Sequence, residues 1–344
     1  MKIQKIWSPT QIYERHRIPG MIVTARGTLF VYTEARREFS DWGEMDILLK
    51  RSTDGGESFG EPIVLANGNE THKTVNNPTM VEDRNGRIHL IYCEDYSIKG
   101  GRVLHRYSDD DGITWSNPDD ITYATAPEER NVFAVGPGHG ICTPAGDLIL
   151  PIWRVPKRYE ARIESHVPSE IGTLYSKDDG VTWQMGEILP IKDELFLPNE
   201  TEIALLEDGS VYLNCRLGAG LTYRGRAYSK TGFSDWTEYE PDKSLYDPIC
   251  FGSVISYKPT GKPHTLIFVN CDSKYERKNI TVKGSTDKGK TWTMRRVIDS
   301  ERGGYAELAV DRSRGNIYVL YEEDAGVNCY LCRFDYEWLE ESRF

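Results

Sequence analysis

The chain has 344 residues with 53 acidic and 42 basic side chains, which gives a net charge of −11 at pH 7. This negative balance argues against a sequence-independent nucleic-acid surface, because such surfaces rely on clustered lysine and arginine. No stretch approaches the roughly 18 consecutive apolar residues of a membrane-spanning helix. We therefore expect no nucleic-acid partner and no membrane insertion.

Short apolar runs rich in β-branched and aromatic residues recur along the chain, whereas helix-period patterns are nearly absent. The runs lie at residues 20–24, 29–33, 88–92, 148–150, 211–213, 265–269 and 317–321. No change of composition and no low-complexity tract divides the chain, so we expect one all-β domain over residues 1–344. The charged stretch at residues 155–171 has the weakest pattern and is predicted to be a long surface loop.

One eight-residue pattern, Ser-x-Asp-x-Gly-x-(Ser/Thr)-(Phe/Trp), occurs four times. The copies begin at Ser52, Ser108, Ser176 and Ser285. Its Asp can accept backbone N–H groups, and its Gly can adopt the positive φ that a tight turn requires. Each copy therefore predicts the turn of one β-hairpin, with the closing aromatic residue packed against the sheet.

The gap between the third and fourth copies is about twice the other spacings, and a degenerate copy from Ser229 to Trp236 lies inside it. A repeat of roughly 50 residues with several short strands per unit is typical of a β-propeller. Five markers leave room for a sixth blade made from the two chain ends, so the predicted fold is a six-bladed β-propeller. The repeat resembles the Asp-box, or BNR repeat, of the sialidase (neuraminidase) superfamily, where it is a structural turn away from the central cavity.

Seven cysteines, an odd number, lie mostly within predicted strands, which indicates buried free thiols in a reducing compartment. The N-terminal segment lacks the apolar core of a secretory signal. We therefore expect a cytoplasmic protein, although a secreted chain from which a signal peptide had been removed would look the same.

Arg17 stands in residues 16–20, which resemble the Arg-Ile-Pro signature that opens the sialidase propeller. The resemblance implies that Arg17 belongs to an arginine triad that holds the carboxylate of the substrate. Arg216, at the end of a predicted strand, resembles the second member, and Arg277, ahead of the fourth Asp-box, resembles the third. Guanidinium groups suit this role because they bind carboxylates through two parallel hydrogen bonds.

Tyr305 begins a segment that resembles the Tyr-Ser run before the last long strand of the family, with Ala306 in place of the more usual Ser. The resemblance implies that Tyr305 is the nucleophile. A phenol is not repelled by the carboxylate of the substrate, but its ordinary pKa of about 10 requires a base. Glu200 resembles the Glu that serves as this base, and Glu202, on the same face of the predicted strand, is the alternative.

The general acid of the family is an Asp on a mobile loop before the first Asp-box. Asp41 matches it when residues 47–51 are aligned with the strand that follows the loop. Asp46 is the alternative, expected at the start of that strand and pointing elsewhere. Phe39 and Trp42 in the same loop are expected to cover the sugar and exclude water.

The histidines are scattered without the spacing of metal ligands, so we expect no cofactor and no catalytic metal. His139, which lies between two glycines, is either a candidate base or part of the cavity wall.

The resemblance extends from about residue 15 to residue 322 and implies a retaining exo-α-sialidase. Such a glycoside hydrolase removes terminal sialic acids from glycoconjugates through a tyrosyl-enzyme intermediate. Two alternatives keep the fold and the arginines: an enzyme acting on another acidic sugar (Kdn, Kdo or a uronic acid), or an intramolecular trans-sialidase. A non-catalytic sugar-binding propeller is the alternative from another class.

Overall fold

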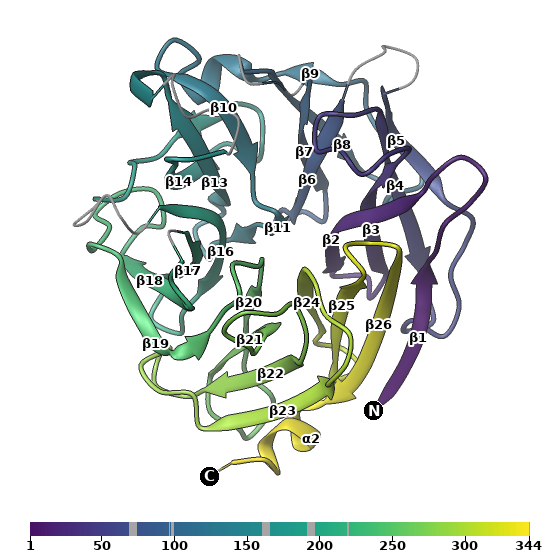
Figure 1. Ribbon diagram of the computed structural model, residues 1–344, viewed down its shortest axis with the longest axis vertical. Helices are drawn as coiled ribbons and strands as arrows, with labels where there is room; N and C mark the ends of the chain where they lie inside the picture. The colour runs from purple at the N-terminus through teal and green to yellow at the C-terminus, as the bar shows by residue number, and fades with distance from the viewer. Residues whose placement is uncertain are drawn as a thin grey trace.

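The structure is a computed structural model that describes residues 1–68, 74–95, 97, 100–159, 166–190, 197–218 and 220–343. Six small sheets stand around a central axis as the blades of a propeller (Figure 1). The predicted all-β, six-bladed fold is therefore confirmed. The short helical segments η1 (Thr122–Thr125) and α2 (Tyr336–Glu340) lie outside the sheets. In the described chain no helix has the length and apolar character needed to cross a membrane.

The first three sheets come from residues 15–185, and apart from β11 and β12 their strands follow one another in sequence order across the sheet. They contain β2 (Arg15–Val23), β3 (Leu29–Arg36), β4 (Met45–Ser52) and β5 (Ile63–Asn67); β11 (Gly138–His139), β6 (Val75–Glu82), β7 (Ile88–Glu94), β8 (Arg102–Ser108) and β9 (Asp119–Asp120); and β10 (Arg130–Val135), β13 (Leu148–Pro156), β14 (Glu170–Ser176) and β15 (Gln184–Met185), with β12 (Ile141–Cys142) also against β13. The stretch predicted as a long loop thus overlaps the ends of β13 and β14, and its residues 160–165 lie outside the described residues.

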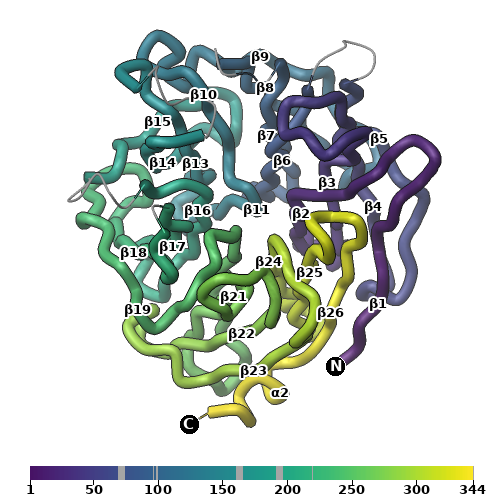
Figure 2. Tube along the Cα trace, in the orientation of Figure 1, coloured from purple at the N-terminus to yellow at the C-terminus, as the bar shows by residue number. Residues whose placement is uncertain are grey.

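The other three sheets follow the same plan. They contain β16 (Pro198–Leu205), β17 (Val211–Leu217), β18 (Tyr223–Ser229) and β19 (Glu240–Tyr246); β20 (Ser253–Tyr257), β21 (Thr265–Cys271), β22 (Ile280–Ser285) and β23 (Met294–Asp299); and β24 (Ala306–Asp311), β25 (Asn316–Glu323), β26 (Asn328–Asp335) and β1 (Lys2–Trp7). The N-terminal strand β1 pairs antiparallel with β26, with Ile3 opposite Cys332 (Figure 2). The two chain ends therefore close the sixth blade, as the sequence predicts.

Middle strands of the blades are buried on both faces, because each blade packs against its two neighbours. All eight residues of β3 and all nine of β13 are buried. A strand covered on both sides reads as a continuous apolar run rather than an alternating one. This explains the uninterrupted Leu-Ile-Leu at the start of β13.

The four Asp-box patterns form turns between the two outermost strands of their blades. In the first, Asp54 accepts N–H bonds from Glu57 and Ser58, both at 3.0 Å, and a hydroxyl bond from Ser58 at 2.6 Å, while Gly56 has a φ of +81°. Equivalent side-chain bonds recur in the other three copies. None of these turn residues lines the central cavity. Their carboxylates serve the turns, as expected.

Candidate active site

A cavity of about 430 Å³ lies at the N-terminal ends of the inner strands β2, β6, β16 and β24. All six residues that the sequence analysis assigns to the site line this cavity: Arg17, Asp41, Glu200, Arg216, Arg277 and Tyr305. Three lie on strands (Arg17 on β2, Glu200 on β16 and Arg216 on β17), and the other three lie on segments that connect strands. The propeller therefore brings together side chains that are up to 288 residues apart in sequence.

Arg17 is carried by an irregularity in β2. The register of β2 against β3 shifts between Arg17 and Gly20, and Ile18 adopts a φ of +53°. The Arg17 guanidinium lies 5.0 Å from the centre of the Tyr305 ring, and its Nε lies 3.7 Å from Glu322. Glu322 also accepts the backbone N–H groups of Ile18 and Tyr305, at 3.1 and 3.2 Å. One buried carboxylate thus orients both the first arginine and the tyrosine.

Arg216 and Arg277 approach Tyr305 from the other side. Arg216, on β17, donates through Nη1 to Glu200 at 2.7 Å and to the Tyr305 hydroxyl at 3.0 Å. Arg277, between β21 and β22, has its guanidinium 5.4 Å from the centre of the Tyr305 ring and donates to the carbonyl of Ile249 at 2.9 Å. Among the described residues no carboxylate lies within ion-pair distance of Arg277. Its positive charge is therefore available to an anion in the cavity.

Tyr305 precedes β24 and is 5% exposed. Its hydroxyl donates a hydrogen bond to Glu200. Burial and the Glu200 carboxylate raise the pKa of Tyr305 above its usual value, while the three arginines act in the opposite direction. The resting phenol is thus protonated and already bonded to the group that can accept its proton.

The structure separates Glu200 from Glu202. The register of β16 against β17 shifts between Pro198 and Thr201, and Glu200 lies in the cavity. Glu202, two residues further along the strand, has a fully buried side chain that accepts a hydrogen bond from the backbone N–H of His139 at 3.3 Å. Glu200, not Glu202, therefore reaches Tyr305. His139 likewise does not line this cavity, although it was considered as a candidate base or wall residue, because it lies beside Glu202.

Asp41 lies on the loop between β3 and β4, with its side chain 49% exposed and 2.5 Å from Nη1 of Arg36. Burial tends to raise the pKa of Asp41, but the Arg36 guanidinium outweighs it and holds the pKa below the usual value. Asp46, the alternative acid, binds Arg37 at 2.9 Å and Tyr13, away from the cavity. Asp41 is thus the aspartate of this loop that faces the cavity.

The loop contributes one of its two expected aromatic covers. Phe39 lines the cavity and is largely exposed, whereas Trp42 does not line it and instead packs on His166, with ring centres 4.7 Å apart. Trp42 thus stands behind the cavity wall, and its expected role as a cover of the sugar stays a prediction. His166 takes the place between Trp42 and the cavity.

Several supporting residues escaped the sequence analysis. The carboxylate of Glu34 is fully buried. It accepts hydrogen bonds from Nε of Arg36 at 2.8 Å and from the backbone N–H of Asn77 at 2.7 Å. Arg36 thereby joins Glu34 to Asp41. A signal was available in the alternation of β3, where Glu34 and Arg36 stand two residues apart on the same face.

Backbone strain is also concentrated here. Five non-glycine residues of the cavity wall have positive φ: Ile18, Asn77, His166, Leu197 and Ile249. For β-branched residues such as Ile18 and Ile249 this conformation costs about 1–2 kcal/mol. Strain of this kind persists only where the surrounding structure enforces it, and it gathers at functional sites.

Comparison with known proteins is consistent with this geometry. Curated proteins named sialidase from Micromonospora viridifaciens and Bacteroides fragilis are each 30% identical to the chain, over 95% and 89% of its length. Residues 27–319 match the sequence profile of the BNR repeat-like domain. The chain belongs to the sialidase superfamily. It spans 52% and 59% of the length of those two relatives.

Solved structures show where this sialidase-superfamily propeller lies within known folds. It superposes on the Hadza microbial sialidase Hz136 with a TM-score of 0.84 at 24% identity, covering 95% of this chain and 67% of that one. It also superposes on the intramolecular trans-sialidase from Ruminococcus gnavus with a TM-score of 0.79 at 18% identity, covering 95% and 96% of the two chains. The propeller fold is therefore shared with proteins named for both activities.

Proposed function

We propose that the protein is a retaining exo-α-sialidase that releases terminal sialic acid from glycans through a covalent bond to Tyr305. One observation carries the proposal: three arginines surround Tyr305, and the hydroxyl of this tyrosine donates to Glu200. A cationic cavity with a tyrosine and its base suits a sugar that bears a carboxylate next to the reacting carbon.

Arg17, Arg216 and Arg277 would bind the substrate carboxylate. Arg17 is already opposed by Glu322 and Arg216 by Glu200, whereas Arg277 lacks a carboxylate partner among the described residues. An incoming carboxylate would therefore gain its largest uncompensated attraction from Arg277. Charge-assisted hydrogen bonds of this type contribute about 1.5–3 kcal/mol each.

In the first step the oxygen of Tyr305 forms a bond to the anomeric carbon as the bond to the leaving oxygen breaks. The phenolic proton passes to Glu200, and Asp41 gives its proton to the leaving oxygen. In the second step Asp41 takes a proton from water, and the water oxygen attacks the anomeric carbon as the bond to the Tyr305 oxygen breaks. Glu200 returns its proton to the departing Tyr305 oxygen. Two inversions give net retention.

The contact between Asp41 and Arg36 sets a condition for this cycle. An acid must carry a proton, yet Arg36 favours the ionised carboxylate in the resting site. We infer that binding of the anionic substrate offsets the positive charge around Asp41, and that the carboxyl group then moves from Arg36 towards the leaving oxygen. The exposed position of Asp41 leaves room for that movement.

A second candidate activity is intramolecular transfer, in which a hydroxyl group of the bound sugar replaces water in the second step. The specific observation in its favour is the match in fold and in length to the intramolecular trans-sialidase from Ruminococcus gnavus. Both activities use the same arginines, base and nucleophile. They differ in what reaches the anomeric carbon after the leaving group departs.

Product analysis tests both proposals. The protein is incubated with α2,3- and α2,6-sialyllactose, and the products are identified by mass spectrometry, with NMR used to follow the anomer released first. Free sialic acid appearing as the α-anomer supports the hydrolase, whereas a product lighter by one water supports transfer. Binding of sialyllactose without turnover would contradict both and favour a sugar-binding propeller. Turnover of a Kdn, Kdo or uronic-acid glycoside alone would change the substrate class.

A further inference from the structure

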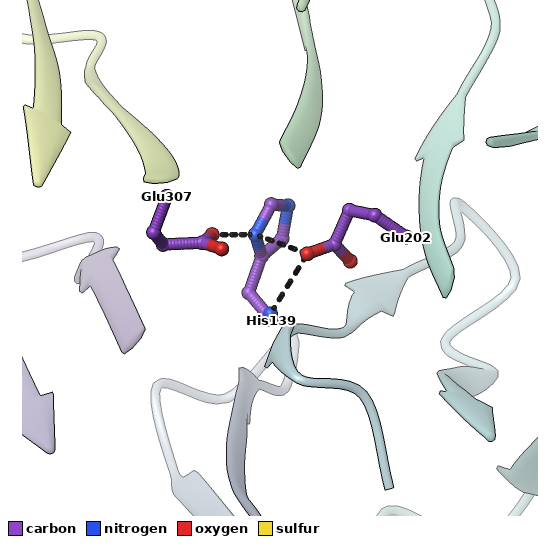
Figure 3. Close-up of side chains that lie close together, drawn as sticks. All are labelled: His139, Glu202 and Glu307. Atoms are coloured by element: carbon purple, nitrogen blue, oxygen red, sulfur yellow. Dashed lines mark hydrogen bonds and ion pairs between the residues drawn. The ribbon is translucent and has the colours of Figure 1, made fainter. Parts of the chain in front are cut away.

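A buried cluster of three potential metal ligands lies on the propeller axis outside the candidate active site. It consists of His139 from β11, Glu202 from β16 and Glu307 from β24, whose ligand atoms lie within 4.8 Å of one another. Figure 3 shows the His139 ring between the two carboxylates. The sequence analysis expected no catalytic metal because the histidines are scattered without the spacing of metal ligands, and it could not foresee that His139 meets two glutamates from other blades.

The position of the cluster follows from the inner strands. Tyr305, just before β24, lines the cavity of the candidate active site. Leu308, within β24, lines a second cavity of about 170 Å³. Glu307 stands between them. His139 lines the second cavity, so the cluster lies between this cavity and the candidate active site.

The cluster carries more negative charge than its protein partners compensate. Both glutamates are 0% exposed, and in the described chain the ion pairs of their carboxylates are with His139 alone, at 2.5 Å from Glu307 and 3.6 Å from Glu202. Arg224 attracts the Glu202 carboxylate electrostatically, but its guanidinium is already paired with Asp247 at 3.1 Å. Two buried carboxylates that share one imidazole leave negative charge uncompensated, which either a bound proton or a cation can neutralise.

An independent observation identifies where the neutralising positive charge belongs. Oε2 of Glu307 is fully buried and has no hydrogen-bond partner among the described residues, whereas Oε1 accepts hydrogen bonds from His139 and Ser253. Gly138 explains how the group is assembled: a Cβ atom there would lie 1.9 Å from Oε2 of Glu202 and 2.7 Å from Oε2 of Glu307. The absence of a side chain lets both carboxylates approach the same point of the backbone.

We propose that His139, Glu202 and Glu307 bind one divalent transition-metal ion, for which Zn²⁺ fits best. An imidazole nitrogen with two carboxylates is a ligand set of Zn²⁺, whereas Ca²⁺ and Mg²⁺ take oxygen ligands. Ligand atoms around a tetrahedral Zn²⁺ lie about 3.4 Å apart, given bonds of roughly 2.0–2.2 Å. The separation between His139 and Glu202 already fits, and Glu307 would turn its free Oε2 towards the ion and release its contact with His139.

Such an ion would join inner strands of three blades. Glu202 follows Glu200 by two residues on β16, and Glu307 follows Tyr305 by two residues. The bound metal would therefore hold the spacing between the two strands that carry the candidate nucleophile and its base. This is a structural role, and it does not place the metal in contact with the substrate.

Metal analysis of the whole chain tests the proposal. The protein is stripped with a chelator, equilibrated with Zn²⁺, desalted and measured by mass spectrometry of the metal. We expect about one zinc per chain, an increase in Tm with Zn²⁺, and visible absorption of bound Co²⁺ when cobalt replaces zinc. Glu202→Gln and Glu307→Gln, which keep the shape of the side chains, should each reduce zinc binding at least tenfold. Glu82→Gln, in the wall of the second cavity, is the matched control and should keep it.

If the wild-type chain retains less than about one tenth of an equivalent of zinc, the proposal is overturned, and the result indicates a proton shared by the two carboxylates. Full zinc content in both glutamine variants would overturn it equally. If the variants do not fold, anomalous diffraction at the zinc edge decides: a peak between His139 and Glu307 supports the site, and a peak elsewhere or none contradicts it.

Discussion

The hydroxyl of Tyr305 donates a hydrogen bond to the carboxylate of Glu200, although the two residues stand in different blades of the propeller. Arg216 contacts both groups through a single nitrogen. The phenol is therefore held between a base that can accept its proton and a cation that can stabilise the phenolate. Burial keeps it protonated until it reacts.

Replacing Tyr305 with Phe should lower kcat on sialyllactose by about 1000-fold or more, because the nucleophilic oxygen is removed. Glu200→Gln should lower kcat by about 100-fold or more through loss of the base. Tyr321→Phe is the matched control: this tyrosine is also buried but binds Asp299 outside the cavity, and its loss should leave kcat within a few-fold of normal.

A fluorinated sialic-acid inactivator should label Tyr305, since the fluorine slows breakdown of the tyrosyl intermediate. Peptide mapping by mass spectrometry locates the label. A label on another residue, or none in a protein that turns over substrate, would refute the covalent mechanism.

Arg277→Ala should reduce kcat/KM by roughly 10- to 150-fold, which corresponds to about 1.5–3 kcal/mol of lost charge-assisted hydrogen bonding. Steady-state kinetics on sialyllactose measure the loss. Arg295→Ala is the control, because Arg295 is half-exposed and paired with Asp272 away from the cavity. Near-normal kcat/KM in Arg277→Ala would remove this residue from the triad.

Asp41→Ala should impair substrates with poor leaving groups far more than aryl sialosides, whose phenolate departs with little protonation. We expect a loss of about 100- to 10,000-fold on sialyllactose and less than about tenfold on the aryl glycoside. Glu44→Gln, on the same loop and beside Arg37, serves as control and should affect neither. Equal losses on both substrates would reassign the general acid.

The ion pair of Asp41 with Arg36 predicts a pH dependence of stability. The pKa of Asp41 is lower in the folded state than the ordinary value of about 3.9, so the folded chain binds fewer protons in this range. The stabilisation is therefore complete above about pH 5 and is lost as the pH falls through the folded pKa. Since half of the side chain is exposed, we expect about 1 kcal/mol or less.

Thermal unfolding of wild type and Asp41→Asn between pH 3 and 7 measures this effect. The difference in Tm should be constant above about pH 5 and narrow below pH 4. A difference that widened as the pH fell would contradict the ion pair as its source.

Much of the fold could be predicted because its signals are local. Each Asp-box forms its bonds within eight residues, so the turn is written in one short segment and its recurrence reveals the number of blades. The closure of the sixth blade by the two chain ends could also be predicted, since the five Asp-box copies left one blade without a copy. The arginines and Tyr305 were found through resemblance to a family, and their common cavity is what the propeller fold provides.

Tertiary structure decided the features that depend on contacts between blades. Glu200 was assigned as the base by resemblance and Glu202 was the alternative on the same face of the predicted strand. The irregular start of β16 places Glu200 against Tyr305 and Glu202 against His139. Glu322 could not be recognised as a support for Arg17 and Tyr305, because those contacts form across the closed ring. Short-range hydrogen bonds specify turns and strands from the sequence itself, whereas side chains that meet at the axis depend on how six blades pack around it.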